Sequence, residues 1–268
     1  MREYIIKIGL EGTWELHENE HNQGYIRNFY KAISLCDTDL VFLSDQDDIW
    51  KDDKIEKMSE ILEQKNNISL LSCKYAIINA QDEQQHSLVE TTAVKEDGKI
   101  QAVNVESILR AYHWPGMVMC IRKNFFDEIF PKIDKINVAH DFMFAYLAAD
   151  TDGFYEYNYI GAYHRRHENN TAREEHRVFK LLNLKKKLEE ILITEKLWET
   201  FLNSQLQIKQ KSKEAMERRL LLLKERKIAL EQKSFPKIVG LYWRDKGKSL
   251  RVKSFICDIW LVLFGKKI

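Results

Sequence analysis

Three aspartates, Asp45, Asp47 and Asp48, stand close together directly after the short apolar run 39–43. Carboxylates at this spacing repel one another unless a positive charge neutralises them. Mg²⁺ and Mn²⁺ prefer carboxylate oxygens and often share them with substrate phosphates, and open α/β sheets bind ligands beyond the carboxyl ends of their strands. The cluster therefore fits a cation that holds a nucleotide diphosphate, with one carboxylate on the metal and another on a ribose hydroxyl. The alternative is that Asp47 and Asp48 form a turn before a helix whose positive end attracts acidic residues.

A fourth aspartate, Asp141, stands near the start of the apolar-rich stretch 140–149, which predicts a helix. A carboxylate in this place could accept a proton from a hydroxyl nucleophile. It could instead cap the helix, a role that contributes about 1 kcal/mol. From the residues alone the cap is the commoner role, and both interpretations stay open.

Two further groups of side chains could contact a substrate. The basic segment His164–His167 could hold a phosphate, because guanidinium groups match phosphate oxygens in pairs. A solvated basic turn is the alternative, and a zinc site is disfavoured because no cysteine or acidic ligand stands at a usual spacing. Trp114, directly before a Pro-Gly pair, could stack on a sugar or pack in the core.

Hydrophobic periodicity predicts the elements that must position these residues. Strands are predicted at 39–43, 68–73, 117–121 and 154–163, and helices at 24–36, 52–64, 105–112 and 140–149. Asp52 is expected to cap the second helix, with Ile55, Met58 and Leu62 facing inward. The polar segment 80–100 predicts a surface loop or hairpin. The alternation of strands and helices favours an α/β layer with a mostly parallel sheet.

The chain changes character after Thr171. Residues 173–233 contain no Pro or Gly, which favours two long helices, as an antiparallel pair with a break near Asn203-Ser204. Residues 236–268 carry eight Lys or Arg and two Asp, a net charge of +6, beside Trp, Phe and Leu residues. Such a segment suits the surface of an anionic membrane, or it packs as a helix on the preceding domain with a solvated basic side. No stretch has the roughly 20 apolar residues that a membrane-spanning helix needs.

The composition is that of a globular protein, with 44% hydrophobic and 31% charged residues, and it excludes a disordered or collagen-like chain. The formal net charge of +1 gives no overall attraction to nucleic acid. The four cysteines form no CxxC pair, which fits reduced thiols in a cytoplasmic protein and argues against structural zinc. The N-terminus lacks the apolar core of a signal peptide.

Five segments in order resemble motifs of the family 2 glycosyltransferases of the GT-A fold, in particular bacterial polysaccharide rhamnosyltransferases. They are Asn22-Gln23-Gly24 with Arg27-Asn28-Phe29, similar to the N-x-G segment; Asp45-Gln46-Asp47-Asp48-Ile49-Trp50, similar to the D-x-D metal motif; Trp114-Pro115-Gly116-Met117, similar to the acceptor-side strand; His140-Asp141, similar to the pair that carries the catalytic base; and Tyr163-His164-Arg165-Arg166-His167-Glu168-Asn169-Asn170-Thr171, similar to the closing Y-R-x-H-x-N-N segment. His164 departs from the pattern, because the family more often has Arg after the Tyr, and Arg165 or Arg166 could supply that charge.

The resemblance implies a role for each matching residue. Asp47 is the expected ligand of Mg²⁺ or Mn²⁺, and Asp141 is the expected catalytic base. The expected donor-binding residues are Asp45, Asp48, Asn22, Arg165, Arg166 and His167. The expected acceptor-binding residues are Trp114, Gly116 and His140.

The resemblance also implies the fold and the activity. The fold is a mixed-sheet GT-A domain at 1–172, followed by a helical region at 173–235 and the basic tail at 236–268. The activity is the inverting, metal-dependent transfer of a sugar from a nucleotide-sugar donor to a glycan or lipid-linked glycan, of the hexosyltransferase type, with rhamnose suggested by the D-Q-D-D-I-W form. Such an enzyme works in the cytoplasm, at the inner face of the cell membrane if the tail binds lipid.

Chains of this family begin with a strand–helix–strand unit that binds the nucleobase. Such a unit takes roughly 30 residues, and residues 1–19 are too few to form one. The resemblance therefore implies an N-terminally incomplete domain. The alternative functions are a truncated, non-catalytic remnant and one subunit of a split glycosyltransferase, with an N-terminal partner chain that supplies the unit.

Overall fold

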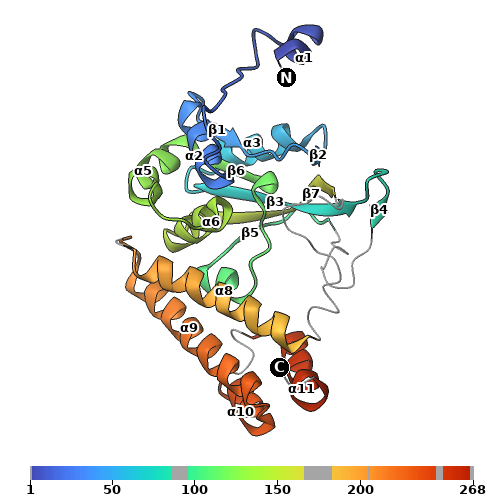
Figure 1. The fold of residues 1–268 in the computed structure, drawn as a ribbon. Coiled ribbons are helices and arrows are strands. Elements are labelled where there is room, and N and C mark those ends of the chain that lie inside the picture. Colours follow the sequence, from blue (N-terminus) through green and yellow to red (C-terminus); the bar gives the residue numbers. More distant parts are fainter. Residues whose placement is uncertain (1, 86–95, 166–182, 205, 246–249, 266–268) are drawn as a thin grey trace.

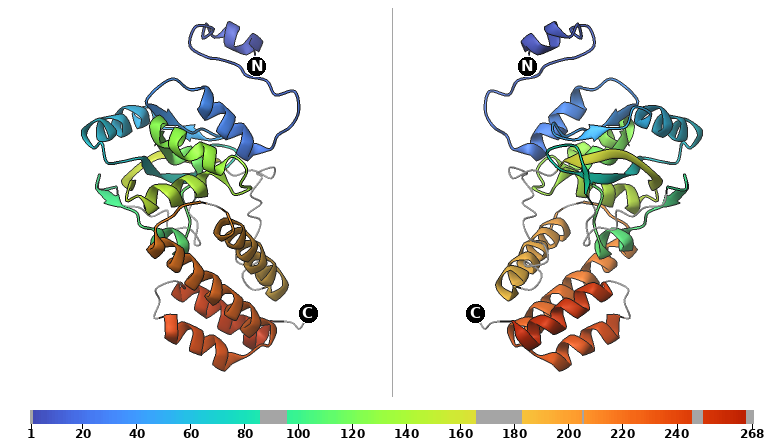
Figure 2. Two further views of the ribbon diagram at one scale, coloured as in Figure 1. Left: turned by 90° about the vertical axis from the view of Figure 1, so that its left-hand side faces the viewer. Right: turned by 90° about the vertical axis from the view of Figure 1, so that its right-hand side faces the viewer.

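The computed structural model describes residues 2–85, 96–165, 183–204, 206–245 and 250–265. These residues form an α/β part around one sheet and a group of long helices at the C-terminal end (Figure 1). The first helix, α1 (Arg2–Lys7), and the last, α11 (Val252–Phe264), lie at opposite ends of the molecule (Figures 1 and 2). The predicted site residues Arg166 and His167 lie outside the described residues.

The sheet has seven strands, and its main path runs β1 (Leu40–Phe42), β6 (Met119–Arg122), β3 (Leu70–Ile78), β7 (Phe154–Arg165) and β2 (Ile49–Trp50). β4 (Gln84–Gln85) pairs with β3, and β5 (Ile100–Ala102) pairs with β7. β3 and β7 are parallel, and every other pair in the described residues is antiparallel. The prediction of a mostly parallel sheet is therefore wrong, whereas the α/β class with a mixed sheet is confirmed. The physical reason is that β6 inserts between β1 and β3, so these two strands are not neighbours.

Helices flank both faces of this sheet. They are α2 (Tyr25–Leu35), α3 (Lys54–Gln64), α4 (Val105–Arg110), the 3-10 turn η1 (Gly116–Val118), α5 (Lys123–Ile133) and α6 (His140–Asp150). Successive strand residues point to opposite faces, so Leu70 packs with α2, α5 and α6, while Leu71 packs with α3 on the other face. The sheet is thus the middle layer of three. Residues 2–39 contain helix and loop and no strand.

Helix α6 is the most enclosed element of the described chain, and every residue in it except Asp141 is buried. One side faces the sheet, and the other faces the C-terminal helices, where the Tyr146 hydroxyl donates to the carbonyl of Ser212 at 3.0 Å. A helix that is apolar all round is buried on all sides. Its first turn, which carries Asp141, is therefore held in place from both layers.

The start of α3 differs from the prediction. The N-cap position is Asp53 rather than Asp52, and no side chain caps the helix. The Asp53 carboxylate instead accepts from the Tyr159 hydroxyl and pairs with Lys57. Met58 and Leu62 are buried as predicted, but Ile55 is 50% exposed, because the inward position one turn before Met58 belongs to Lys54.

The C-terminal part contains α8 (Leu184–Leu202), α9 (Gln210–Glu231), α10 (Phe235–Asp245) and α11. Glu195 pairs with Lys227 at 2.7 Å and Glu199 pairs with Lys224 at 2.6 Å, so α8 and α9 run antiparallel. α10 and α11 pack against α8 and α9 through a third hydrophobic cluster. None of the described helices is long and apolar enough to cross a membrane.

Candidate active site

The acidic loop leaves the sheet after β1 and is fastened by the end of β7. One Asp48 oxygen accepts from the Arg165 backbone N–H at 3.0 Å and lies 3.1 Å from His164 Nδ1. Arg165 Nε donates to the carbonyl of Asp47 at 2.9 Å. The Asp48 side chain is only 2% exposed. Asp48 and Arg165, both predicted to bind the donor, therefore meet in the structure, and their visible role is to fix the shape of the loop.

Asp45 and Asp47 stand on the same loop as charged neighbours. Burial raises the pKa of Asp45, and the carboxylates of Asp48 and Asp47 raise it further, while His164 opposes them. No group of three or more His, Cys, Asp or Glu in the described residues is arranged to hold a metal ion. Mg²⁺ commonly takes one or two carboxylates and completes its shell with phosphate and water. The crowded carboxylates of Asp45 and Asp47 fit a cation of that kind, which arrives together with a diphosphate.

Asp141 is the carboxylate that burial perturbs most clearly at this site. It is the second residue of α6, whose N-cap is Ala139, so the prediction that Asp141 could cap the helix is wrong. Its Oδ1 accepts from the Phe142 N–H at 2.7 Å, and the Tyr112 hydroxyl also hydrogen-bonds to it. Burial, with a contribution from the charge of Asp45, raises the pKa of Asp141 to about 6. The two carboxylates are thus close enough to interact, although 96 residues separate them in the sequence.

His140 and Gly116 meet beside Asp141. The His140 imidazole is 5% exposed and stacks on Phe29 with ring centroids 4.1 Å apart. A Cβ at Gly116 would lie 3.0 Å from His140 Nε2, so glycine leaves room for the ring. Burial lowers the pKa of His140 to about 4, which keeps the ring neutral, and neither ring nitrogen has a hydrogen-bond partner among the described residues. A buried imidazole in this state can bind a hydroxyl group.

Residues 3–130 match the family model described as Glycosyl transferase family 2. This match supports a family 2 glycosyltransferase of the GT-A fold. The matched range covers the acidic loop and η1, whereas Asp141 and Arg165 lie beyond it.

A solved structure similar to this chain is the crystal structure of S. aureus TarS 1-349. The similarity covers 96% of this chain and 67% of that chain, with a TM-score of 0.52 and 12% sequence identity. At this identity the likeness shows the fold alone. No curated protein matched the chain.

Trp114 lies in the core of the α/β part rather than at a free surface. It is 4% exposed, and its indole N–H donates to Glu156. The structure therefore favours core packing over stacking on an acceptor sugar, so the predicted acceptor contact at Trp114 is dropped. Burial raises the pKa of Glu156, but hydrogen bonds from His113, Lys74 and Trp114 outweigh it and lower the pKa to about 2. Glu156 is thus ionised and is held in place beside Trp114 and His113.

Lys54, which follows the acidic segment in the sequence, joins the two sides of the site, a role that its place in the sequence did not predict. Its ammonium group donates to the carbonyl of Met117 in η1 at 2.6 Å and lies 3.7 Å from the centre of the Trp50 ring. The side chain is fully buried, and burial lowers its pKa to about 8. Lys54, Met58 and Leu62 share one helix face at four-residue spacing. Because Met58 and Leu62 were predicted to face inward, the four-residue spacing also predicts that Lys54 is buried.

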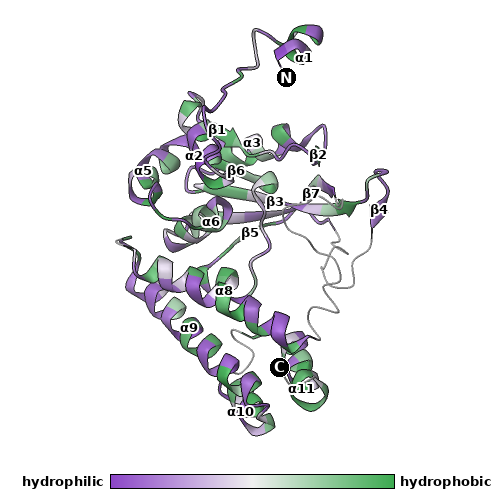
Figure 3. Ribbon diagram, in the orientation of Figure 1, coloured by the Kyte–Doolittle hydropathy of each residue, from purple (hydrophilic) through white to green (hydrophobic). Residues whose placement is uncertain are grey.

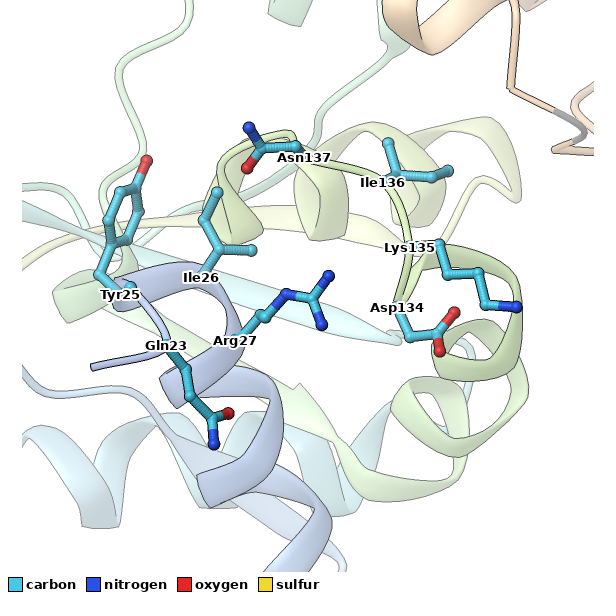
Figure 4. A pocket seen from close by; sticks show the side chains of 9 residues that line it. Gln23, Tyr25, Ile26, Arg27, Asp134, Lys135, Ile136 and Asn137 are labelled. Carbon is cyan, nitrogen blue, oxygen red and sulfur yellow. The ribbon is translucent and has the colours of Figure 1, made fainter. Parts of the chain in front are cut away.

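A pocket of about 360 Å³ opens between the N-terminus of α2 and residues 134–137. Figure 4 shows the Arg27 side chain reaching across it toward the segment of Asp134 and Lys135. Tyr25, on its rim, has its ring centroid 6.0 Å from that of His140. Asn22 is exposed, and its side chain accepts from the Gly24 N–H at 2.9 Å. The N-x-G segment therefore borders the side of the site that holds His140.

Proposed function

We propose that the chain transfers a sugar from a nucleotide-sugar donor to a hydroxyl group of a glycan or lipid-linked glycan acceptor, with inversion. The observation that carries the proposal is the pair of carboxylate environments formed by Asp45 and Asp141. Asp45 belongs to a crowded acidic loop, whereas Asp141 is buried with a pKa of about 6. Two acids with separated roles at one site are what such a transfer needs.

In the proposed reaction, the acceptor hydroxyl attacks the anomeric carbon, and the bond from that carbon to the diphosphate breaks. Asp141 takes the hydroxyl proton, because a base with a pKa near neutral is efficient at that task. His140 Nε2 binds the acceptor beside it, and Gly116 leaves the space. A divalent cation held by Asp47, with Asp45 beside it, would supply stabilisation of the negative charge that grows on the diphosphate.

Arg165 and Lys54 position the machinery in this proposal. Arg165 holds the Asp47 carbonyl, so the loop presents its carboxylates in one arrangement. Lys54 ties the start of α3 to η1, so the donor side and the acceptor side keep a fixed separation. Both contacts are made within the chain, before any substrate binds. Rhamnose as the transferred sugar is part of the proposal through the resemblance of the D-Q-D-D-I-W segment.

The experiment that tests the donor site is calorimetric titration of the full chain with a nucleoside diphosphate, with Mn²⁺ and without it. We expect binding that requires Mn²⁺ and that Asp47→Asn weakens at least tenfold, since a charged ligand to the cation is lost. The matched control is Asp127→Asn, which removes an exposed carboxylate on α5 that pairs with Lys123. Equal weakening by both variants, or Mn²⁺-independent binding, contradicts the proposal.

A second candidate is one subunit of a split glycosyltransferase. The observation that favours it is the edge of β1, which among the described residues pairs only with β6. A free edge can pair with a strand from another segment or chain. If the chain alone binds the nucleoside diphosphate with Mn²⁺ and transfers sugar, this candidate is excluded. Activity that appears only on adding an N-terminal strand–helix–strand chain supports it.

A further inference from the structure

Helix α11 has two apolar faces on opposite sides. Its inner face, with Asp258, Leu261 and Val262, is buried against α9 and α10. A helix turns by about 100° per residue, so residues on the opposite side recur three and four positions apart. In α11 these outer positions are apolar as well, with exposed fractions of 70% for Val252, 63% for Ile256, 38% for Trp260, 56% for Leu263 and 67% for Phe264.

The orientation of α11 is fixed by a buried ion pair. Arg226 of α9 donates to both oxygens of Asp258, at 2.6 and 2.7 Å, and both side chains are almost fully buried. The Tyr242 hydroxyl of α10 also hydrogen-bonds to Asp258 at 3.3 Å. Rotating α11 to bury its outer face would leave a buried charge without its partner, which costs about 3–5 kcal/mol. The outer face therefore stays exposed in the folded chain.

The charge around this face selects its partner. Asp258 is the one acidic residue of α11, and the inner face holds it. Arg251 and Lys253 stand at the start of the helix, and Lys266 and Lys267 follow it in the sequence, within a segment of net charge +6. A second copy of the chain would bring the same positive charge against this one. An anionic lipid surface offers both apolar depth and opposite charge.

The length of α11 sets how it can meet a membrane. Its 13 residues span about 20 Å, well short of the roughly 30 Å hydrocarbon core of a bilayer. We propose that α11 lies flat in the interface of an anionic membrane, with its outer face among the lipids. Figure 1 shows α11 at the end of the molecule far from the N-terminus, and the hydropathy colours of Figure 3 show that the helix is largely apolar. Docking there leaves the sheet and its acidic loop clear of the bilayer, and it is independent of the transfer reaction.

The experiment is co-sedimentation of the full chain with vesicles of phosphatidylcholine alone and with added phosphatidylglycerol. We expect at least about tenfold tighter binding to the anionic vesicles, since each basic residue near such a surface contributes about 1 kcal/mol, and weaker binding as salt screens the charge. The triple variant Ile256→Ser, Trp260→Ser, Leu263→Ser should lose at least about tenfold in binding. The matched control replaces three exposed apolar residues of α8 and α9, Leu192→Ser, Ile193→Ser and Leu221→Ser, and should bind as the unmodified chain does.

A second measurement needs no disruptive substitution. Lipids with brominated acyl chains quench nearby Trp fluorescence, so the unmodified chain should be quenched on anionic vesicles more than Trp260→Phe. Absence of vesicle binding, equal loss in the triple variant and its control, or equal quenching of the chain and Trp260→Phe overturns the proposal. A dimer in sedimentation equilibrium that the triple variant dissociates also overturns it, because a second copy then covers the face.

Discussion

Replacing Asp141 by Asn separates the proposed catalytic role of this residue from the cost of its burial to stability. Burial and the charge of Asp45 raise the pKa of Asp141 from 3.8 to about 6. That difference of about two pKa units corresponds to about 3 kcal/mol between the folded and unfolded chain when the group is ionised. Partial exposure of Asp141 makes this an upper bound. Asn keeps the size of the side chain and can still accept from the Phe142 N–H.

The sign of the effect follows from the raised pKa. The folded chain resists ionisation of Asp141. The free energy of unfolding is therefore highest below about pH 4, falls by the contribution of Asp141 as the pH rises to about 6, and stays at the lower value above it. We therefore expect Asp141→Asn to be more stable than the unmodified chain at pH 8 by up to about 3 kcal/mol, and equally stable near pH 3.8. Urea unfolding at both pH values measures this difference.

The same variant should lose sugar transfer by a factor of about 10² to 10⁴, the usual contribution of a general base. Its binding of nucleoside diphosphate with Mn²⁺ should be unchanged, which isothermal titration measures. The control Asp127→Asn should change neither quantity. Retained transfer would remove Asp141 from the role of base, and equal stability of variant and unmodified chain at pH 8 would refute the argument from burial.

Three further substitutions test other parts of the structure. The lowered pKa of Lys54 makes the folded chain gain stability as the pH rises from about 8 to 10.5, by up to about 3 kcal/mol, and urea unfolding should show that this gain is absent in Lys54→Met. Gly116→Ala places a Cβ 3.0 Å from His140 Nε2 and should raise the KM for acceptor while leaving nucleotide binding intact, as steady-state kinetics and calorimetry will show. Asp258→Asn leaves Arg226 buried without its charge partner and should lower the free energy of unfolding by about 3–5 kcal/mol. The double variant Arg226→Met, Asp258→Leu should recover most of the lost free energy of unfolding, because it leaves no buried charge. An Asp258→Asn variant as stable as the unmodified chain would contradict the assigned pairing.

Local spacing predicted the helices that present one apolar stripe. α2 and α3 lie within a few residues of the predicted ranges, because a buried helical face leaves a regular trace in the sequence. α6 was also predicted, but from a continuous apolar run, because it is buried on all sides. α5 was not predicted; proline is normally excluded from the interior of a helix, and Pro131 is compatible with this helix because it stands in the last turn. The order of the strands was also out of reach, since β6 pairs with β1 across about 80 residues and no local pattern encodes a long-range partner.

In the candidate site, too, the local sequence predicted which residues are present but not which distant residues contact them. The types and spacing of Asp45 and Asp47 made them candidates for a site that binds a cation and a diphosphate, and the resemblance to the family 2 glycosyltransferases added the expected roles of Asp47 and Asp141. What the sequence could not show is how neighbours change them. Asp48 turns from a candidate ligand into an anchor only because β7 brings the Arg165 N–H to it. Trp114 has no free face because the His113 ring stacks on it with centroids 3.9 Å apart and Phe154, 40 residues later, packs against it.

The charge of Asp45 acts on Asp141, so the proposed donor side of the site is coupled to the proposed base. Because the charge of Asp45 helps to raise the pKa of Asp141, removing that charge should lower the pKa of Asp141. Asp45→Asn is therefore expected to move the titration of the Asp141 carboxyl carbon, followed by NMR, to lower pH, while Asp127→Asn leaves it in place. An unmoved titration would show that the two carboxylates do not interact. A shift in the expected direction implies that any positive charge placed at Asp45 also makes Asp141 a weaker base, so the acidity of the base depends on the occupancy of the donor side.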